Sequence, residues 1–248
     1  MRRTAIDKDL HEYQFDPEPG KDYGFNLYVL MDGRNALLID TAYEEQAAEV
    51  LADLNSRGYS LGQVIISHFH PDHVSGLRAL PTVAVWAGEK HSLTLDEYPV
   101  EERDKFPPVQ GLADAAGMQF GSFKLTFREA PGHTLCSIYT IINDRYVHVA
   151  DNLMAGNDGT PVLPWAEFEQ VGAHIQSLEM LKELDPKVLL LSHGKRIVGE
   201  EAIAAEIEDR LMYLRAVRDG NGEISVEEAT AGCSRRFLCE RWHIRSEQ

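Results

Sequence analysis

Residues 67–73 read SHFHPDH, a stretch that packs three histidines and one aspartate into seven positions. It follows the apolar residues 64–66, which are typical of a short buried strand. In an extended segment, residues two apart point the same way, so His68 and His70 can bind one ion together. A polar loop that happens to be rich in histidine is the alternative interpretation of this stretch taken alone.

The second half of the stretch changes direction. Pro71 has a fixed φ and can begin a helix. The turn that follows redirects Asp72 and His73, which can then reach a second position. The stretch therefore predicts a metal site in which the residues serve two neighbouring positions.

Metal-capable residues also follow three other predicted strands. Loops at strand ends on a rigid scaffold are where functional sites usually lie, so these residues can converge although they are far apart in the sequence. The full candidate set holds five imidazoles and two carboxylates. One tetrahedral zinc uses about four ligands, so the set suits two ions that share a bridging ligand. The three strands span 124–130, 146–150 and 188–192, and the residues after them are His133, Asp151 and His193.

The wider pattern predicts an α/β fold with two similar halves. Apolar runs at 25–31 and 36–40 around Asp32-Gly33 indicate a hairpin, and a helix and the strand of the quoted stretch follow. The second half repeats this order, from strand pairs with turns at Gly121 and Asn143 to helix, strand and a long acidic helix. Such halves predict an α/β sandwich whose sheets face each other.

We expect one domain over residues 1–248. The segment 88–112 is charged and holds three prolines, which predicts a partly helical surface excursion that serves as a lid. Residues 199–248 are expected to form a C-terminal helical extension. Trp165, Phe168 and the segment 96–108 are candidates to line a substrate pocket, with simple packing as the default.

The composition limits the classes of partner and the cellular compartment that we expect for the protein. Lys and Arg number 24 against 40 Asp and Glu, which gives a formal net charge of −16 and no electrostatic footprint for nucleic acid. The three cysteines do not form a disulfide framework. We find neither a secretory signal nor a run of about 18–20 apolar residues, so we expect a soluble, cytoplasmic protein without membrane contact. The oligomeric state is left open, with a homodimer as one alternative.

These landmarks, taken together, resemble the metallo-β-lactamase superfamily. An H-x-H-x-D-H cluster, PGHT at 131–134, a strand-terminal Asp and a strand-terminal His occur in that order, and Asp40 in LLIDT precedes them. The resemblance spans roughly residues 24–200. It implies a four-layer αββα sandwich of two mixed β-sheets with outer helices.

The resemblance also implies a role for each site residue. It places Asp151 as a bridge between two metal ions, and Asp40 as a residue that orients ligands without binding metal itself. The ions would be divalent, with zinc as the first choice and iron or manganese as alternatives. The first ion would be held by His68, His70 and His133, and the second by Asp72, His73 and His193.

The chemistry expected of such a site is hydrolysis. Two ions lower the pKa of a water toward neutrality and supply a hydroxide, which Asp72 is positioned to orient. We expect a small-molecule ester, lactone or thioester of the glyoxalase II kind as the substrate. β-Lactamase or phosphodiesterase activity, a mononuclear-iron persulfide dioxygenase and a silent binding module are the alternatives.

Three details stand apart from this pattern. His133 begins HTLCS rather than the H-T-P-G-H or H-T-P-G-S typical of the family, which puts Cys136 near the site; we interpret it as a small buried residue rather than a catalytic thiol. His148 is assigned to packing, although it lies only three residues before Asp151. The stretch 219–228 resembles part of a calcium loop but lacks the opening aspartate, which favours a helix–helix turn.

Overall fold

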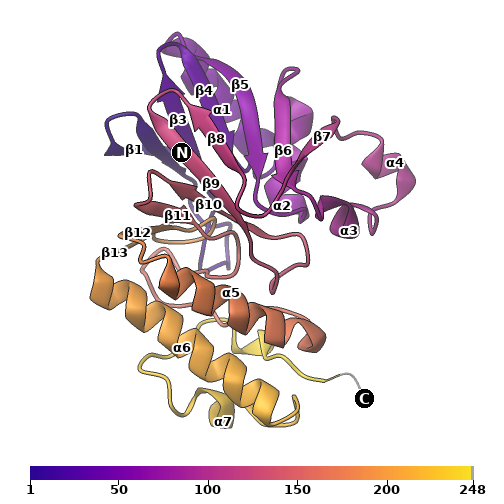
Figure 1. The fold of residues 1–248 in the computed structure, drawn as a ribbon, viewed down its shortest axis with the longest axis vertical. Coiled ribbons are helices and arrows are strands. Elements are labelled where there is room, and N and C mark those ends of the chain that lie inside the picture. The colour runs from indigo at the N-terminus through magenta and orange to yellow at the C-terminus, as the bar shows by residue number, and fades with distance from the viewer. Residues whose placement is uncertain (247–248) are drawn as a thin grey trace.

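The structure is a computed structural model that describes residues 1–246 of the chain (Figure 1). Its strands form two sheets, one of seven strands in the order β1-β2-β3-β4-β5-β6-β7 and one of six in the order β13-β12-β11-β10-β9-β8. The first sheet consists of β1 (Arg2–Asp7), β2 (Leu10–Gln14), β3 (Asn26–Asp32), β4 (Asn35–Ile39), β5 (Ser60–Ile66), β6 (Ala84–Gly88) and β7 (Val109–Leu112). The second consists of β8 (Gly117–Phe120), β9 (Phe123–Glu129), β10 (Ile138–Ile142), β11 (Tyr146–His148), β12 (Val188–Leu190) and β13 (Ile197–Val198).

The two sheets pack face to face because their strands are apolar on both sides. In β3, Tyr28 and Leu30 pack in the core between the sheets, whereas Leu27 and Val29 pack in a second core under the helices of the first sheet. Successive side chains of a strand point to opposite faces, so this alternation buries both faces of β3. The predicted αββα sandwich is confirmed.

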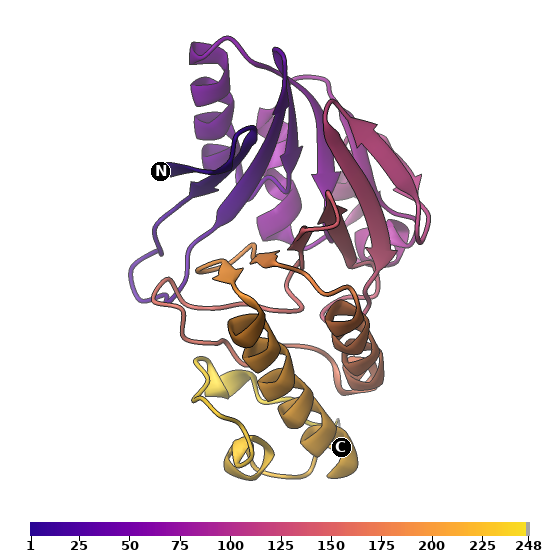
Figure 2. The same ribbon diagram turned by 60° about the vertical axis from the view of Figure 1, so that its left-hand side comes forward.

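Helices cover the outer face of each sheet. α1 (Glu44–Ser56) buries Ala47, Val50 and Leu54 toward the first sheet. On the other side, α5 (Val171–Glu183) and α6 (Glu200–Asp219) form the outer layer of the second sheet, with the short η2 (Phe168–Gln170) leading into α5. α1 and the α5–α6 pair lie at opposite ends of the molecule with the sheets between them (Figure 2).

Chain direction brings the polar strand ends to one edge. β4, β5 and β6 are mutually parallel, and so are β11 and β12, because helices make the connections between them. Backbone bonds then join the two sheets at this edge. Asn26 donates from its N–H to the Ser192 carbonyl (2.7 Å), and Ile138 donates to the Ser67 carbonyl (2.9 Å). The loops that follow these strands are therefore held close together.

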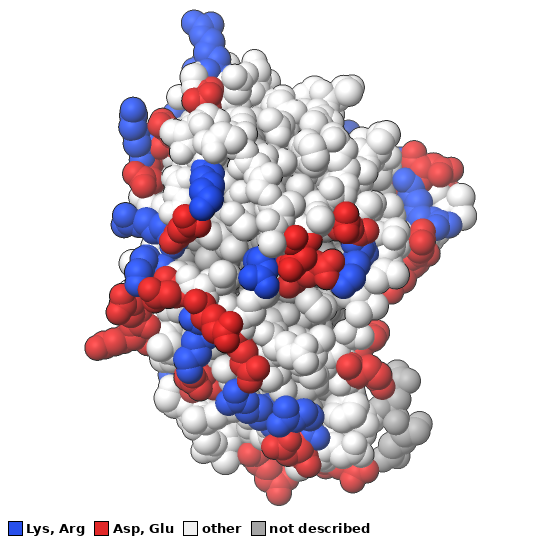
Figure 3. Space-filling model, in the orientation of Figure 1, with Lys and Arg blue, Asp and Glu red and all other residues white. Residues whose placement is uncertain are grey.

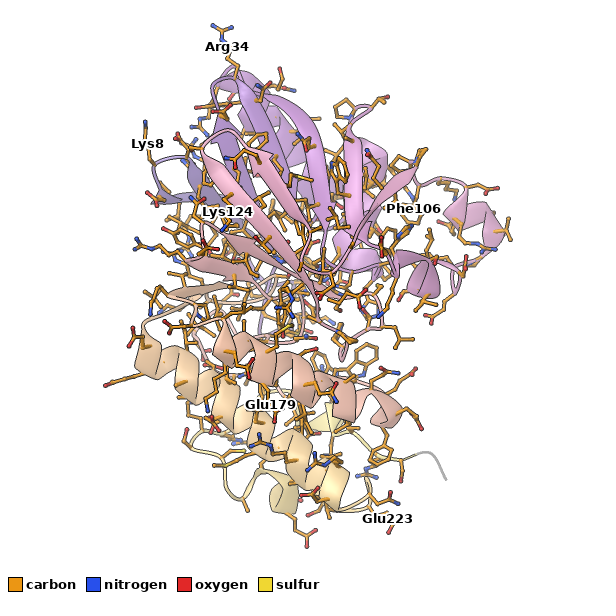
Figure 4. All side chains as sticks on the ribbon, in the orientation of Figure 1. Lys8, Arg34, Phe106, Lys124, Glu179 and Glu223 are labelled. Carbon is orange, nitrogen blue, oxygen red and sulfur yellow. The ribbon has the colours of Figure 1, made fainter. Side chains whose placement is uncertain are left out.

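The segment 88–112 is only in part an excursion. It contains α3 (His91–Leu95) and α4 (Val100–Arg103), but its last residues form β7, which pairs in parallel with β6. Phe106, labelled in Figure 4, lies beyond α4 and packs edge-on against the ring of Phe69 at 6.3 Å between centroids. The hydroxyl of Tyr98 donates to the Phe69 carbonyl (2.8 Å). The two short helices are thus anchored beside the SHFHPDH stretch, next to α2 (Pro71–Val74) and η1 (Ser75–Ala79).

The C-terminal stretch contributes to the core rather than only extending from it. Ile203, Ile207 and Leu211 of α6 pack in the same cluster as the second sheet and α5. Glu179 of α5, labelled in Figure 4, accepts a hydrogen bond from Arg215 of α6 (2.8 Å). After α6, the chain forms α7 (Val226–Thr230) and the short η3 (Glu240–Trp242) and returns toward the sheets.

Charges of both signs are present on the face of the molecule seen in Figure 3. Acidic and basic side chains alternate on the face shown in Figure 3. Within residues 1–246, no helix is both long enough and apolar enough to cross a membrane.

Candidate metal centre

All seven predicted ligands lie together at the edge where the two sheets meet. Three groups of metal-capable side chains have ligand atoms within 4.8 Å of one another. His73 belongs to two of the groups, and His68 does as well, so the groups form one continuous cluster. The groups are His68, His70 and His133; His68, His73 and Asp151; and Asp72, His73 and His193.

Asp151 is central to this cluster. Its Oδ2 lies 3.3 Å from Nε2 of His193, 3.4 Å from Nε2 of His73 and 3.7 Å from Nε2 of His133. On the far side, Asp72 Oδ2 lies 3.4 Å from Nε2 of His193. These separations exceed the usual 2.7–3.2 Å of an N–H···O hydrogen bond. One carboxylate oxygen thus faces imidazoles of both predicted metal positions without a tight bond to any of them.

The other ring nitrogen of three of these histidines is held by an oxygen. His73 Nδ1 lies 2.8 Å from Asp40 Oδ2, His133 Nδ1 lies 3.0 Å from the Trp165 carbonyl, and His193 Nδ1 lies 3.1 Å from the Gly24 carbonyl. A carbonyl or carboxylate oxygen can only accept, so each Nδ1 carries the proton. In the neutral ring, Nε2 then keeps its lone pair. That of His133 faces Nδ1 of His70 at 3.0 Å, whereas those of His73 and His193 have no hydrogen-bond partner in the described chain.

Several of the inward atoms have no hydrogen-bond partner in the described chain. They are Nε2 of His68, His73 and His193, and Oδ1 of Asp151, and all four are buried. Buried polar atoms without partners are rare in folded proteins because their removal from water costs free energy that no hydrogen bond compensates. A cation between these lone pairs would satisfy them, so the residues present fit a metal ion.

The electrostatics differ between the two sides of the cluster. Burial lowers the pKa of His68 well below its usual range, and burial also lowers the pKa of His70. Burial lowers the pKa of His133 to about 3, although Asp151 opposes the shift. These imidazoles are therefore neutral at physiological pH, which is the protonation state that binds metal.

On the side of the cluster next to Asp72 and Asp151, the pKa values of the histidines shift in the opposite direction. Burial alone would lower the pKa of His193, but Asp151 and Asp72 outweigh it and raise that pKa to about 10. Asp151 and Asp40 raise the pKa of His73 against the effect of burial in the same manner. These shifts describe the chain without cations, and they show how strongly this side of the cluster favours positive charge.

Asp40 contacts His73 and the strand end beside it. Asp40 is buried, and its Oδ1 accepts from the backbone N–H of Ser67 (2.7 Å) while its Oδ2 accepts from the Ser67 hydroxyl (2.7 Å). Although burial would raise the pKa of Asp40, His73 lowers it overall, so the carboxyl stays ionised. Asp40 thus contacts a proposed ligand without facing the cluster itself, and its orienting role stays a prediction.

Sequence reasoning missed Asn152, which fixes the loop of His133. Its Oδ1 accepts from the backbone N–H of His133 (3.2 Å), and its Nδ2 donates to the Ala130 carbonyl (2.9 Å) and to the Tyr139 hydroxyl (3.0 Å). Nε2 of His174 lies 3.1 Å from the Asn152 carbonyl. The only signal in the sequence was a polar residue directly after Asp151.

His148, three residues before Asp151 in the sequence, is buried among polar atoms near the cluster. Its Nε2 lies 3.2 Å from the Ser192 hydroxyl and 3.7 Å from Asp40 Oδ2. It belongs to none of the three groups of candidate ligands. Its contacts are with residues that surround Asp40, so it supports the centre from outside.

Two glycines allow the loops to approach each other. A Cβ at Gly194, directly after His193, would lie 1.7 Å from the Ala155 carbonyl oxygen, and φ there is +84°. A Cβ at Gly132, directly before His133, would lie 2.6 Å from the backbone of His174. Only glycine fits at both positions, which sets where the neighbouring histidines can lie.

Two other candidates are structural. Cys136 is buried and packs in the core beneath the helices of the first sheet. In the stretch 219–228, the Glu228 carboxylate accepts from the Ser225 N–H (3.0 Å), and the Ser225 hydroxyl accepts from the Glu228 N–H (3.2 Å). This reciprocal pair caps α7 and occupies the glutamate that a calcium loop would need, so the predicted helix–helix turn is confirmed.

The sequence of this chain matches a family model described as the metallo-beta-lactamase superfamily over residues 22–193. The chain belongs to the metallo-β-lactamase superfamily. The matched region contains every candidate ligand and ends at His193, so α6 and the C-terminal segment lie outside it.

Relatives in the superfamily include named hydrolases. A hydroxyacylglutathione hydrolase of Ruegeria pomeroyi is 30% identical over 163 residues, which are 61% of this chain and 58% of that protein. An atrochrysone carboxyl ACP thioesterase of Aspergillus aculeatus is 27% identical over 217 residues, 84% of this chain and 62% of that protein. The matched part thus spans about three fifths of the length of these relatives.

Solved structures agree on the fold. A metallo-β-lactamase from Pontibacter korlensis superposes with a TM-score of 0.67 at 17% sequence identity, covering 85% of this chain and 98% of that one. At this level of identity the likeness establishes the αββα sandwich and leaves the reaction to the site itself.

Proposed function

We propose that this chain is a metal-dependent hydrolase that cleaves a thioester, or a related ester or lactone, of a small molecule. The observation that carries the proposal is the convergence of unpartnered Nε2 atoms around the Asp151 carboxylate. The relatives named as a hydroxyacylglutathione hydrolase and as an ACP thioesterase favour the thioester among the substrates expected from the sequence.

The proposed metal ligands follow the three groups in space. His68, His70 and His133 would hold one divalent ion, with zinc as the first choice. Asp72, His73 and His193 would hold a second ion, and Asp151 would serve both. Mixed imidazole and carboxylate ligands also suit iron or manganese.

When bound, such ions supply Lewis acidity and lower the pKa of a coordinated water. The chain's own residues supply orientation and a place for the proton. Asp72 is partly exposed to the cavity, and although burial would raise its pKa, His73 and His193 hold that pKa well below its ordinary value. Its carboxylate is thus ionised and can accept a hydrogen bond from the attacking water. In thioester hydrolysis, water adds to the acyl carbon, the C–S bond breaks and the thiol leaves with the proton.

The cavity in front of the centre has room for the substrate. It has a volume of about 350 Å³ and is lined by His70, Asp72, His133 and Asp151 together with aromatic side chains. Ligand sites of this kind are concave and mostly apolar, with a few polar groups at the reacting end.

A His133→Ala variant tests the proposal. Its metal content and its hydrolysis of glutathione and N-acetylcysteamine thioesters should both fall to a small fraction of those of the unmodified protein, because one ion loses a ligand. His11→Ala is the matched control, since His11 lies on β2 and its Nδ1 has no partner to lose. A His133→Ala protein that keeps both metal and activity would contradict the ligand assignment. One iron per chain without thioesterase activity would favour the mononuclear dioxygenase instead.

A further inference from the structure

The cavity beside the candidate ligands is lined by aromatic side chains. Tyr23, Trp165 and Trp242 line it, together with Met154. The rings of Tyr23 and Trp242 meet edge to face, with centroids 6.1 Å apart and an interplanar angle of 63°. The ring of Trp165 lies 5.2 Å from that of His133, and 45% of Trp165 is exposed. Such an exposed indole beside a cavity has free surface for a ligand to cover.

Trp242 comes from the C-terminal segment, residues 231–246, which lies outside the matched family region. Polar contacts hold this segment against α6. Arg235 binds Asp209 Oδ2 (2.9 Å) and Glu206, both of which are buried.

A second anchor lies right beside Trp242. Ile244 donates from its N–H to the Tyr213 hydroxyl (2.9 Å), and His243 Nδ1 lies 3.2 Å from the same hydroxyl. These bonds fix the backbone on the C-terminal side of Trp242. The indole is therefore a built part of the cavity wall and not a loose end of the chain.

The charges around the cavity argue against an anionic substrate tail. Among the described residues that line it, none is Lys or Arg, and the ionised groups are Asp72 and Asp151. A neighbouring cavity of about 120 Å³ that shares Trp165 is lined by Glu97 and Glu167, again without Lys or Arg. A glutathione moiety carries two carboxylates, which would find no Lys or Arg among the lining residues of either cavity.

From these lining residues we infer that the cavity selects thioesters or esters with a flat, uncharged aromatic acyl group, which packs against Trp165, Tyr23 and Trp242. The inference rests on the proposed hydrolase function and names its substrate class. Aromatic pairs gain stabilisation beyond that from burial of area, which favours a ring over an alkyl chain of equal size. A volume of about 350 Å³ accommodates one or two fused rings beside the reacting carbon.

Trp242→Ala and Trp242→Phe test the inference against a control on the same segment. Arg236→Ala removes a side chain that is 86% exposed. For each protein, kcat and KM are measured with the acetyl and 2-naphthoyl thioesters of N-acetylcysteamine. Calorimetry on the same proteins, with their metal bound, measures the binding of 2-acetylnaphthalene, a neutral ketone that cannot be hydrolysed.

We expect the unmodified protein to prefer the naphthoyl over the acetyl thioester. Trp242→Ala should reduce this preference about tenfold, mainly through KM, and weaken ketone binding by a similar factor, whereas Trp242→Phe should keep most of both. Arg236→Ala should match the unmodified protein. An unchanged preference in Trp242→Ala, an equal loss in Arg236→Ala or the absence of ketone binding would each overturn the inference.

The two readouts separate this inference from the proposed function. If no thioester is hydrolysed by any of the proteins, the proposed function fails, while ketone binding and its loss in Trp242→Ala still decide whether the cavity is an aromatic pocket. If thioesters are hydrolysed without regard to the acyl group, the function stands and the inference fails.

Discussion

Replacing Asp40 by asparagine should weaken metal binding although Asp40 is not itself proposed as a ligand. In the structure, Asp40 Oδ1 accepts from the Ser67 N–H, and Oδ2 accepts from both the Ser67 hydroxyl and His73 Nδ1. The amide oxygen of asparagine can replace Oδ1, but its NH₂ group then occupies the position of Oδ2. A donor would thus face the N–H of His73.

This conflict is relieved if His73 moves its proton to Nε2. That atom lies 3.4 Å from Asp151 Oδ2, so the proton would occupy the lone pair proposed to bind metal. Losing a buried hydrogen bond to a charged group costs about 1.5–3 kcal/mol, which corresponds to about 10- to 100-fold in affinity. Mutation of residues that orient metal ligands typically reduces metal affinity by a similar factor.

The assay is a zinc titration in competition with a chromophoric chelator, with circular dichroism to establish that the variant is folded. Asp114→Asn serves as the control because Asp114 also accepts from a backbone N–H, that of Glu129 (2.9 Å), but lies on the surface away from the cluster. A folded Asp40→Asn protein with zinc affinity within twofold of the unmodified protein would refute the reasoning.

Two further predictions concern stability. Burial lowers the pKa of His174 from 6.5 to about 4, so below pH 6.5 the unfolded chain binds a proton that the folded chain does not bind. As the pH falls toward 4, this difference lowers the free energy of unfolding by about 3 kcal/mol. In urea unfolding, the stability of His174→Gln should therefore fall by about 3 kcal/mol less than that of the unmodified protein over this pH range, and parallel pH profiles would contradict the prediction. Gly194→Ala should lower the free energy of unfolding by more than about 2 kcal/mol, because φ is positive there and a Cβ would meet the Ala155 carbonyl. In the control Gly172→Ala, the added Cβ would meet nothing within 4 Å, so that change should be neutral or stabilise the protein by up to about 1 kcal/mol. Equal unfolding midpoints of the two variants would contradict this.

Much of the fold could be predicted because it is encoded locally. The hairpin β3–β4, the turn at Asn143 between β10 and β11, and the helices α5 and α6 all follow from periodicity and turn residues. The turn at Asn143 and Asp144 has positive φ at both positions, which these residue types tolerate. Local pattern therefore located most elements near the centre.

β1 and β7 were missed because backbone pairing rather than side-chain pattern defines them. β1 reads RRTAID and is mostly exposed, so it has little apolar pattern, and it exists as a strand because it pairs with β2 at the edge of the first sheet. β7 lies directly after two prolines in a charged segment, yet it completes the same sheet by pairing with β6. Backbone pairing of this kind leaves a weak trace in side-chain pattern.

The sequence by itself determined which side chains could form the centre, since histidines and aspartates directly after predicted strands are a local property of the chain. Only the tertiary structure decided which ring nitrogen of each histidine faces inward, that Asn152 holds the His133 loop, and that Trp242 lines the cavity. The physical reason is distance along the chain. The bond that orients His193 comes from the Gly24 carbonyl, 169 positions away, and exists only because the two sheets dock at that edge.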